Sequence, residues 1–108
     1  MKIEDLKNAP QWLLDANTEN ADVEIIDGVV HWHDGVWRDG EWNGGTWHDG
    51  DWLDGTWHSG SWHAGDWFDG TWHSGTWYDG AWHDGYWLDG VWVQGYIFST
   101  KPPKAEEE

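Results

Sequence analysis

The sequence predicts an all-β protein built as a β-solenoid, in which one chain winds into stacked coils, and three observations predict it. Tryptophan recurs at every fifth residue from Trp32 to Trp92 without a gap. Glycine follows each of these tryptophans by three positions, from Gly35 to Gly95, so that the unit x-Trp-x-x-Gly fills residues 31–95. A short, fixed period is typical of repeats that each stack on their neighbours and together form a rod.

Each pentad is expected to form one side of a coil. Glycine at every fifth position excludes a helix, and three residues with a central Trp fit a short strand. The last two residues, often Asp-Gly, favour a corner in which glycine takes a positive φ. Asp precedes the glycine in eight pentads: Asp34, Asp39, Asp49, Asp54, Asp69, Asp79, Asp84 and Asp89.

The segments on either side of the array do not follow the repeat. Residues 1–30 are predicted to form an N-terminal cap, with a short helical segment around residues 9–14 and a hairpin that turns at Asp27-Gly28. Solenoids need such caps because their open strand edges otherwise pair with other chains. Residues 96–108 are predicted to form a closing strand followed by a disordered tail.

The tryptophans are expected to point into the solenoid. Thirteen indoles on the outside of so small a body would exceed the apolar surface that soluble monomers expose. An inward indole buries on the order of 200 Å², and its N–H then needs an acceptor, which we expect from backbone carbonyls at the corners.

The number of sides per coil is open between three and four. Outside Trp and Gly, a shift of 15 residues within the array gives 10 identities in 30 pairs, whereas a shift of 20 gives 5 in 27, which favours a triangle. Volume favours a square, because a triangle with sides of ~16 Å encloses only roughly 500 Å³ per coil, about what three indoles require. On that steric argument we expect four sides.

This pattern resembles the pentapeptide-repeat proteins. In that family, a large central residue and a small residue two positions earlier both point inward, as Trp37 and Gly35 would here. The resemblance covers residues 31–95, implies a right-handed four-sided coil, and is weak in identity, since the family's usual Ala-Asp/Asn-Leu is absent. The array is also similar to Trp-Gly pentads found in uncharacterised phage and bacterial proteins.

Composition excludes several functions. The chain has 108 residues, no cysteine and a net charge of −16, which argues against direct binding to nucleic acid or to an anionic membrane. The first residues lack the apolar run of a signal peptide, so we expect a cytoplasmic protein, in the host cytoplasm if it is phage-encoded.

No enzymatic activity, cofactor or metal is expected. Outward side chains on a convex rod provide no pocket that excludes water, and the Asp-Gly pairs are explained by turn chemistry better than by calcium. On a square coil Asp49, Asp69 and Asp89 would share a column, Asp34 would lie above Asp54, and His63 would stack on His83 as a weak candidate zinc pair. The threonines of the array suggest ice binding only weakly, and the outward aromatic residues Phe68, Tyr78 and Tyr86 are too scattered for a carbohydrate platform.

The sequence therefore favours a non-enzymatic, acidic interaction module. The array has 11 acidic residues and one basic residue, and about three square coils would give it roughly the charge of duplex DNA of the same length. Some pentapeptide-repeat proteins resemble DNA and occupy enzymes such as gyrase, which implies a phage-encoded mimic that inhibits a host DNA-handling protein through a basic surface. The eight corner aspartates would form the partner-binding face.

Two further expectations concern assembly. One rod is short, so we expect a homo-oligomer formed end to end as a dimer. The apolar residues expected at its interface are Val91, Val93, Tyr96, Ile97 and Phe98. The alternative function is a structural component of a virion, tail fibre or surface assembly, in which the N-terminal cap would be the docking piece.

Overall fold

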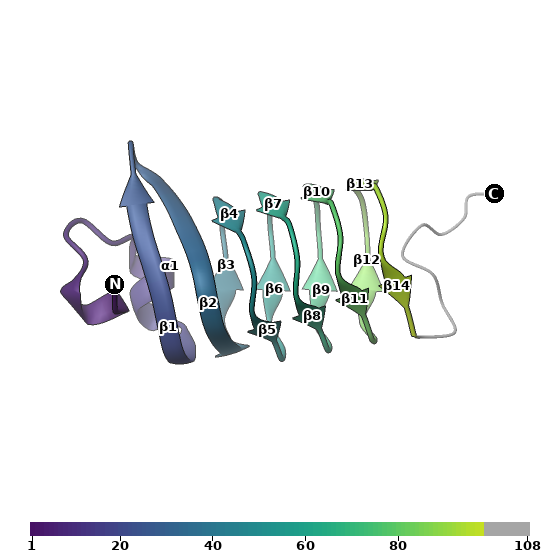
Figure 1. Cartoon of the computed structure of the whole chain (residues 1–108), viewed down its shortest axis with the longest axis horizontal. Coiled ribbons are helices and arrows are strands. Elements are labelled where there is room, and N and C mark those ends of the chain that lie inside the picture. Colours follow the sequence, from purple (N-terminus) through teal and green to yellow (C-terminus); the bar gives the residue numbers. More distant parts are fainter. Residues whose placement is uncertain (99–108) are drawn as a thin grey trace.

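The fold is a parallel β-solenoid of about four coils that is closed at its N-terminal end by a hairpin and a short helix (Figure 1). It is known here from a computed structural model, which describes residues 1–98. The array repeats the pentad as a two-residue strand followed by a corner, as the spacing of Trp and Gly predicts. The tail predicted for residues 99–108 lies outside the described residues.

Each coil contains fifteen residues and has three sides. Strands pair in parallel with strands fifteen residues further along, so that Trp32 aligns with Trp47, Trp37 with Trp52 and Trp42 with Trp57. Side one contains residues 31–33 of β2 (Val29–Asp39), β4 (Thr46–Trp47), β7 (Ser61–Trp62), β10 (Thr76–Trp77) and β13 (Val91–Trp92). Side two contains residues 36–38 of β2, β5 (Asp51–Trp52), β8 (Asp66–Trp67), β11 (Ala81–Trp82) and β14 (Tyr96–Ile97). Side three contains β3 (Glu41–Trp42), β6 (Thr56–Trp57), β9 (Thr71–Trp72) and β12 (Tyr86–Trp87).

The expectation of four sides was wrong, and the sequence phase of fifteen residues was the better guide. The volume argument placed the main chain inside the polygon, together with the indoles. In the structure the main chain forms the perimeter, and the fully buried side chains within residues 31–95 are those of the tryptophans, three to each coil. Three indoles therefore fill a triangle that has no space for anything else. The right-handed winding stays a prediction.

The interior is a packed column of tryptophans, which confirms the inward orientation. Every Trp from Trp32 to Trp82 has an exposed fraction of 0%. Along the axis, each indole stacks on the one fifteen residues later, with Trp47 and Trp62 centroids 4.8 Å apart and their planes only 6° apart. Around each coil the rings meet edge to face, as between Trp57 and Trp62 at 5.8 Å and 73°. Both are favourable aromatic geometries, and burial adds about 5 kcal/mol per indole.

The expected acceptors for the indole N–H groups are not present. The eleven fully buried tryptophans from Trp32 to Trp82 have no hydrogen-bond partner for Nε1 within the described residues. The corner carbonyls already accept from the next coil, as the oxygen of Gly60 does from the N–H of Thr76 at 3.0 Å. Leaving one N–H unpaired costs about 1–3 kcal/mol, which is less than the gain from burying the ring.

The corner glycines are required by backbone geometry. Gly65 has a φ of +117°, and a Cβ there would lie 2.2 Å from the carbonyl oxygen of Gly50 in the preceding coil. Both the positive φ and this contact exclude an L side chain. The predicted corner conformation is thus confirmed, with the neighbouring coil as an additional constraint.

The N-terminal segment covers the first coil. β1 (Asn17–Ile26) pairs antiparallel with β2 along sides one and two, and the chain turns between them at Asp27 and Gly28, whose φ angles are 52° and 79°. Two positive φ angles are the mark of the predicted type I′ turn. The helix α1 (Gln11–Asp15) lies against β3, and the single 3₁₀ turn η1 (Ile3–Asp5) precedes it.

Within residues 1–98, the helices are all too short and too polar to cross a membrane. The described residues measure 44 × 23 × 19 Å along their principal axes, so the solenoid is a short rod. Its three flat sides and three corners carry all side chains of the array other than the tryptophans.

Candidate interaction surface

The corner aspartates form hydrogen bonds within the corners. In each of the eight Asp-Gly pairs, the Oδ1 of the aspartate accepts a hydrogen bond from the N–H of the glycine that follows, at 2.8 Å. This contact shows that the aspartates take part in the corners, as turn chemistry predicts. The second carboxylate oxygen of Asp79 accepts from the Nε2 of Gln94 at 3.2 Å, and in the other seven aspartates this oxygen has no protein partner within the described residues.

The fifteen-residue coil arranges these aspartates differently from the square. The columns expected for Asp49, Asp69 and Asp89, and for Asp34 above Asp54, were wrong, because residues twenty apart lie on different corners. The corner that follows side two instead carries an unbroken ladder of four residues: Asp39, Asp54, Asp69 and Asp84. The corner that precedes side two carries Asp34, Asp49 and Asp79, with Ala64 and Gln94 at the other two rungs. Asp89 lies alone on the third corner, below Ser74.

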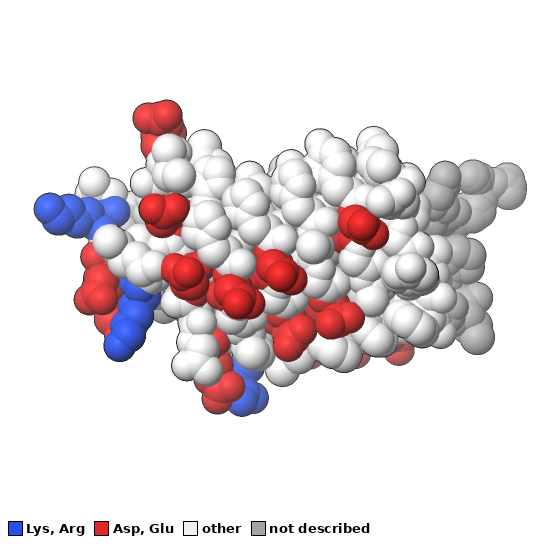
Figure 2. Space-filling view, viewed as in Figure 1, with Lys and Arg blue, Asp and Glu red and all other residues white. Residues whose placement is uncertain are grey.

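Side two itself carries Asp51 and Asp66, which occupy neighbouring rungs between the two corner ladders. Nine of the 11 acidic residues of the array therefore lie on or beside one side of the triangle. We call this surface the carboxylate face, defined by Asp51, Asp66 and the two corner ladders. Figure 2 shows acidic side chains in a band along the solenoid, and the Lys and Arg side chains of the described residues that are visible in this view lie toward the end that carries the cap.

The pKa of Asp51 reflects both the burial of its carboxylate and the negative charges around it on the carboxylate face. Partial burial raises the pKa of Asp51 above its usual value, and the negative charges of Asp66, Asp34 and Asp49 raise it further. A cationic partner would relieve this repulsion. Arg38, which lies on side two of the first coil, already pairs with Glu19 at 2.9 Å.

Histidines form ladders on the other two sides. His33, His48 and His63 stack along side one, at 4.9 and 5.6 Å between ring centroids, and His58 stacks on His73 along side three at 5.1 Å. The expected stack of His63 on His83 was wrong, since His63 is followed by Tyr78 on its column. Within residues 1–98, no group of three or more His, Asp or Glu side chains is placed to hold a metal ion.

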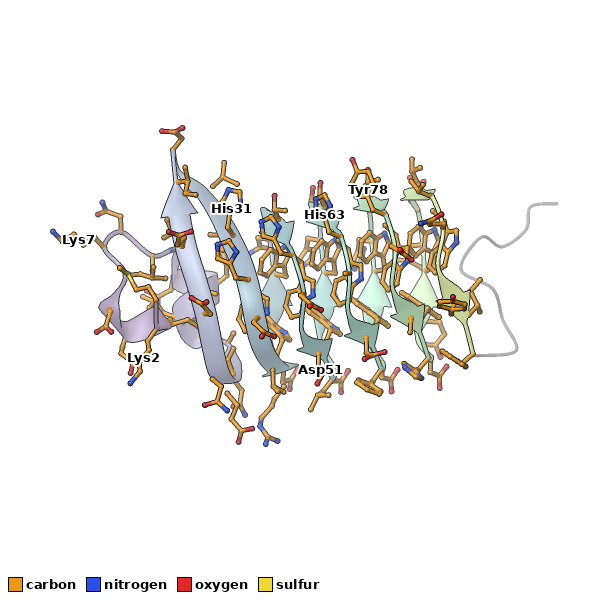
Figure 3. All side chains as sticks on the ribbon, in the orientation of Figure 1. Lys2, Lys7, His31, Asp51, His63 and Tyr78 are labelled. Atoms are coloured by element: carbon orange, nitrogen blue, oxygen red, sulfur yellow. The ribbon has the colours of Figure 1, made fainter. Side chains whose placement is uncertain are left out.

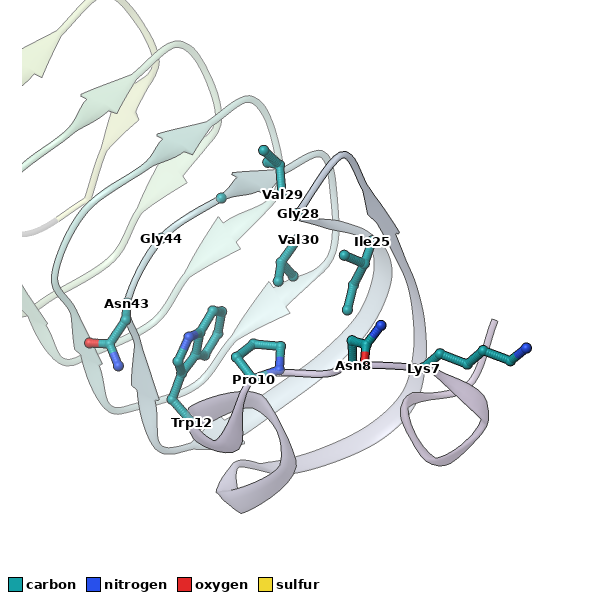
Figure 4. A pocket seen from close by; sticks show the side chains of 11 residues that line it. Lys7, Asn8, Pro10, Trp12, Ile25, Gly28, Val29, Val30, Asn43 and Gly44 are labelled. Carbon is teal, nitrogen blue, oxygen red and sulfur yellow. The ribbon is translucent and has the colours of Figure 1, made fainter.

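The largest cavity lies at the cap rather than on the array. It is an open groove of about 650 Å³ between the segment before α1, the tip of the hairpin and the corner at residues 43–45 (Figure 4). Pro10, Trp12, Ile25 and Val30 line it, and Lys7 is its one charged residue. It brings no nucleophile together with a base, and the absence of enzymatic activity stays a prediction.

The C-terminal coil exposes the five residues predicted for an oligomer interface. Exposed fractions run from 38% for Ile97 to 71% for Tyr96, and Val91, Val93 and Phe98 lie between them. Tyr86 was predicted to point outward but not to belong to this interface, and Leu88 was not predicted at all; they are 67% and 58% exposed on the same coil. They flank Trp87, the last tryptophan on side three, and this position could have suggested them.

The minor alternatives find little support in the arrangement. Phe68, Tyr78 and Tyr86 lie on sides two, one and three, so they form no common platform for a sugar. The threonines divide between side one (Thr46 and Thr76, with Ser61 between them) and side three (Thr56 and Thr71).

Comparison with known proteins gives no further assignment. No protein-family model, curated protein or solved structure matches this chain. The solenoid and its five-residue repeat therefore stand on the chain's own sequence and structure.

Proposed function

We propose that this protein is a non-enzymatic interaction module that binds the basic surface of a protein partner through its carboxylate face. One observation carries the proposal, namely that nine of the 11 carboxylates of the array lie on or beside a single side. Charge used only for solubility has no reason to gather on one of three equivalent sides. A charged partner approaching from that direction meets most of the field of the array.

The charge of the rod is comparable with that of duplex DNA of the same length. With three sides per coil in place of four, the rod is longer than expected from the sequence. The 65 residues of the array form 65/15 coils, or ~21 Å of rod at ~4.8 Å per coil, instead of the ~16 Å expected for a square. The array has a net charge of 1 − 11 = −10, and duplex DNA carries about 12 charges over that length.

The spacing of the two corner ladders supports mimicry of nucleic acid. One five-residue side separates them, which is at most ~16 Å for an extended chain. The major groove of B-DNA is ~12 Å wide, so two rows of negative charge lie on a similar scale in both molecules. A phage-encoded inhibitor of a host DNA-handling protein, acting in the host cytoplasm, is the specific form of this proposal.

End-to-end dimerisation through Val91, Val93, Tyr96, Ile97 and Phe98 would double the length of charged surface. The exposed apolar side chains of the last coil support this arrangement. The resemblance to pentapeptide-repeat proteins supports it only through the pentad and the inward central residue, since fifteen residues per coil replace the family's twenty.

A structural role is the second candidate, favoured by the same apolar coil at the C-terminal end. A rod whose last coil exposes apolar side chains can join a larger assembly, with the cap as a second point of attachment. Mass spectrometry of purified virions or surface layers would detect it, and absence from such particles would count against this candidate.

Affinity capture from host lysate over a range of salt concentrations tests the proposal. A partner bound through the carboxylate face should dissociate progressively as salt rises. The double variant Asp51→Asn/Asp66→Asn should weaken capture at least tenfold, whereas Glu41→Gln/Asp89→Asn, which removes two charges elsewhere, should stay within about twofold. Equal effects of the two variants, or a partner insensitive to salt, would contradict the proposal.

A further inference from the structure

We propose that His31 and His48 form a binding site for a divalent transition-metal ion, with Cu²⁺ and then Ni²⁺ preferred over Zn²⁺. The site lies on side one of the first two coils, beside the hairpin, and is separate from the interaction proposed above. Figure 3 shows His31, His63 and Tyr78 in a row along this side of the solenoid.

Two ring nitrogens converge here. The Nδ1 of His31 lies 3.0 Å from the Nε2 of His48. Without a metal, one of the two nitrogens must donate a proton and the other must accept it. A metal ion takes the place of that shared proton, and each neutral ring then carries its proton on its other nitrogen: Nε2 in His31 and Nδ1 in His48.

The separation of the nitrogens indicates the metal. At metal–nitrogen distances of ~2.0–2.1 Å, two ligands 3.0 Å apart subtend about 95° at the ion, whereas a tetrahedral angle would place them roughly 3.4 Å apart. Angles near 90° are typical of the square-planar and tetragonal sites of Cu²⁺ and Ni²⁺, and Zn²⁺ prefers the tetrahedron. Water completes the coordination. The two rings meet nearly head to head, with centroids 5.3 Å apart and planes 15° apart, so each ring must turn by roughly 40° to direct its lone pair at the ion.

The surroundings hold His48 in place. The ring of His33 stacks on it at 4.9 Å, and His33 is itself fixed by a contact of 2.9 Å between its Nε2 and the Oε1 of Glu24. A neutral imidazole is the form that binds metal, and a net charge of −16 attracts cations to the molecule.

Sequence position alone does not reveal this pair. His31 and His48 are seventeen residues apart, one before its tryptophan and the other after, so they meet only because the coil has fifteen residues and β2 runs beside β4. On the four-sided coil the two residues would lie on different sides.

Isothermal titration of the untagged, full-length protein with CuCl₂, NiCl₂ or ZnCl₂ tests the proposal, with electron paramagnetic resonance of the Cu²⁺ complex as a second readout. We expect one site per chain, two nitrogen ligands in the Cu²⁺ spectrum, and the order Cu²⁺, Ni²⁺, Zn²⁺ of decreasing affinity. His31→Ala and His48→Ala should each weaken Cu²⁺ binding at least tenfold. His73→Ala is the matched control, because it also removes one member of a stacked pair, and it should stay within about twofold.

Three results would overturn the proposal. The first is unchanged Cu²⁺ binding in His48→Ala, and the second is an equal loss in His73→Ala. The third is tighter binding of Zn²⁺ than of Ni²⁺, which would contradict the ~95° geometry. Far-ultraviolet circular dichroism of each variant identifies unfolding as a separate cause, and His31→Gln, which keeps the polar side chain, then replaces any alanine variant that fails to fold.

Discussion

The two ends of the solenoid differ, although the same pentad reaches both. At the N-terminal end, Trp12 of α1 packs on Trp42 at 5.1 Å, and the tryptophans of the first coil are as fully buried as those in the middle. At the C-terminal end, Trp87 and Trp92 are only partly buried by residues 1–98. The repeat thus supplies the interior, but an end must be covered by residues that the repeat does not contain.

The first prediction compares the middle of the rod with its C-terminal end. Trp62→Ala removes a ring that is stacked on both sides, and we expect a loss of about 5 kcal/mol in the free energy of unfolding. Trp92→Ala removes a ring stacked on one side only, so we expect less than half of that loss. Urea denaturation followed by circular dichroism measures both, and equal losses would mean that the last coil is covered as well as the middle.

The second prediction concerns the corners. Gly65→Ala places a methyl group 2.2 Å from the oxygen of Gly50 at a φ of +117°, and we expect a loss of about 4 kcal/mol. Gly44→Ala is the control at a corner of the first coil, where a Cβ meets nothing within 4 Å, and it should change the unfolding free energy by less than about 1 kcal/mol. A tolerated Gly65→Ala would contradict the close stacking of coils.

The third prediction removes the difference between the ends. Trp12→Ala uncovers the first coil, and we expect a loss of about 3 kcal/mol together with greater quenching of indole fluorescence by iodide. Leu14→Ala, at a side chain that is 49% exposed on the same helix, should have little effect. If Trp12→Ala leaves quenching unchanged, α1 does not cover the core.

The fourth and smallest effect is on pH dependence. Because the pKa of His48 is lowered in the folded protein, the unfolded chain binds more protons, and stability should fall as pH drops through about 6.5. His48→Gln should reduce this fall and His73→Gln should change it less. Asp51 acts in the opposite sense, because its raised pKa means that ionisation of the carboxyl above pH 3.8 disfavours the folded state. Thermal unfolding between pH 7 and pH 5 tests the histidine effect, and identical slopes in the two histidine variants would contradict it.

Much of the fold could be predicted because one short pattern is repeated. The five-residue period predicted the solenoid, the large apolar surface of the indole predicted that the tryptophans point inward, and Asp27-Gly28 predicted the hairpin turn. Two expectations failed for physical reasons. The volume estimate assigned the main chain to the interior of the coil as well as to its perimeter. The carbonyl oxygens expected to accept from the indole N–H groups already accept from backbone N–H groups of the next coil.

The candidate surface was predicted only in part. The eight corner aspartates could be named from the sequence, but their grouping depends on the number of residues per coil. Only with fifteen do Asp39, Asp54, Asp69 and Asp84 form one ladder, and only then do Asp51 and Asp66 lie beside them. The same number brings His31 and His48 together.

Disulfide cross-linking tests the fifteen-residue coil most directly, because the chain contains no cysteine of its own. Thr46 and Ser61 are aligned in neighbouring parallel strands, ~4.8 Å apart, within the range in which a disulfide forms. The account predicts that Thr46→Cys/Ser61→Cys oxidises readily to an intramolecular disulfide and that Ser61→Cys/Ala81→Cys, twenty residues apart, does not. Cross-linking of the second pair without the first would contradict the three-sided coil and every surface derived from it.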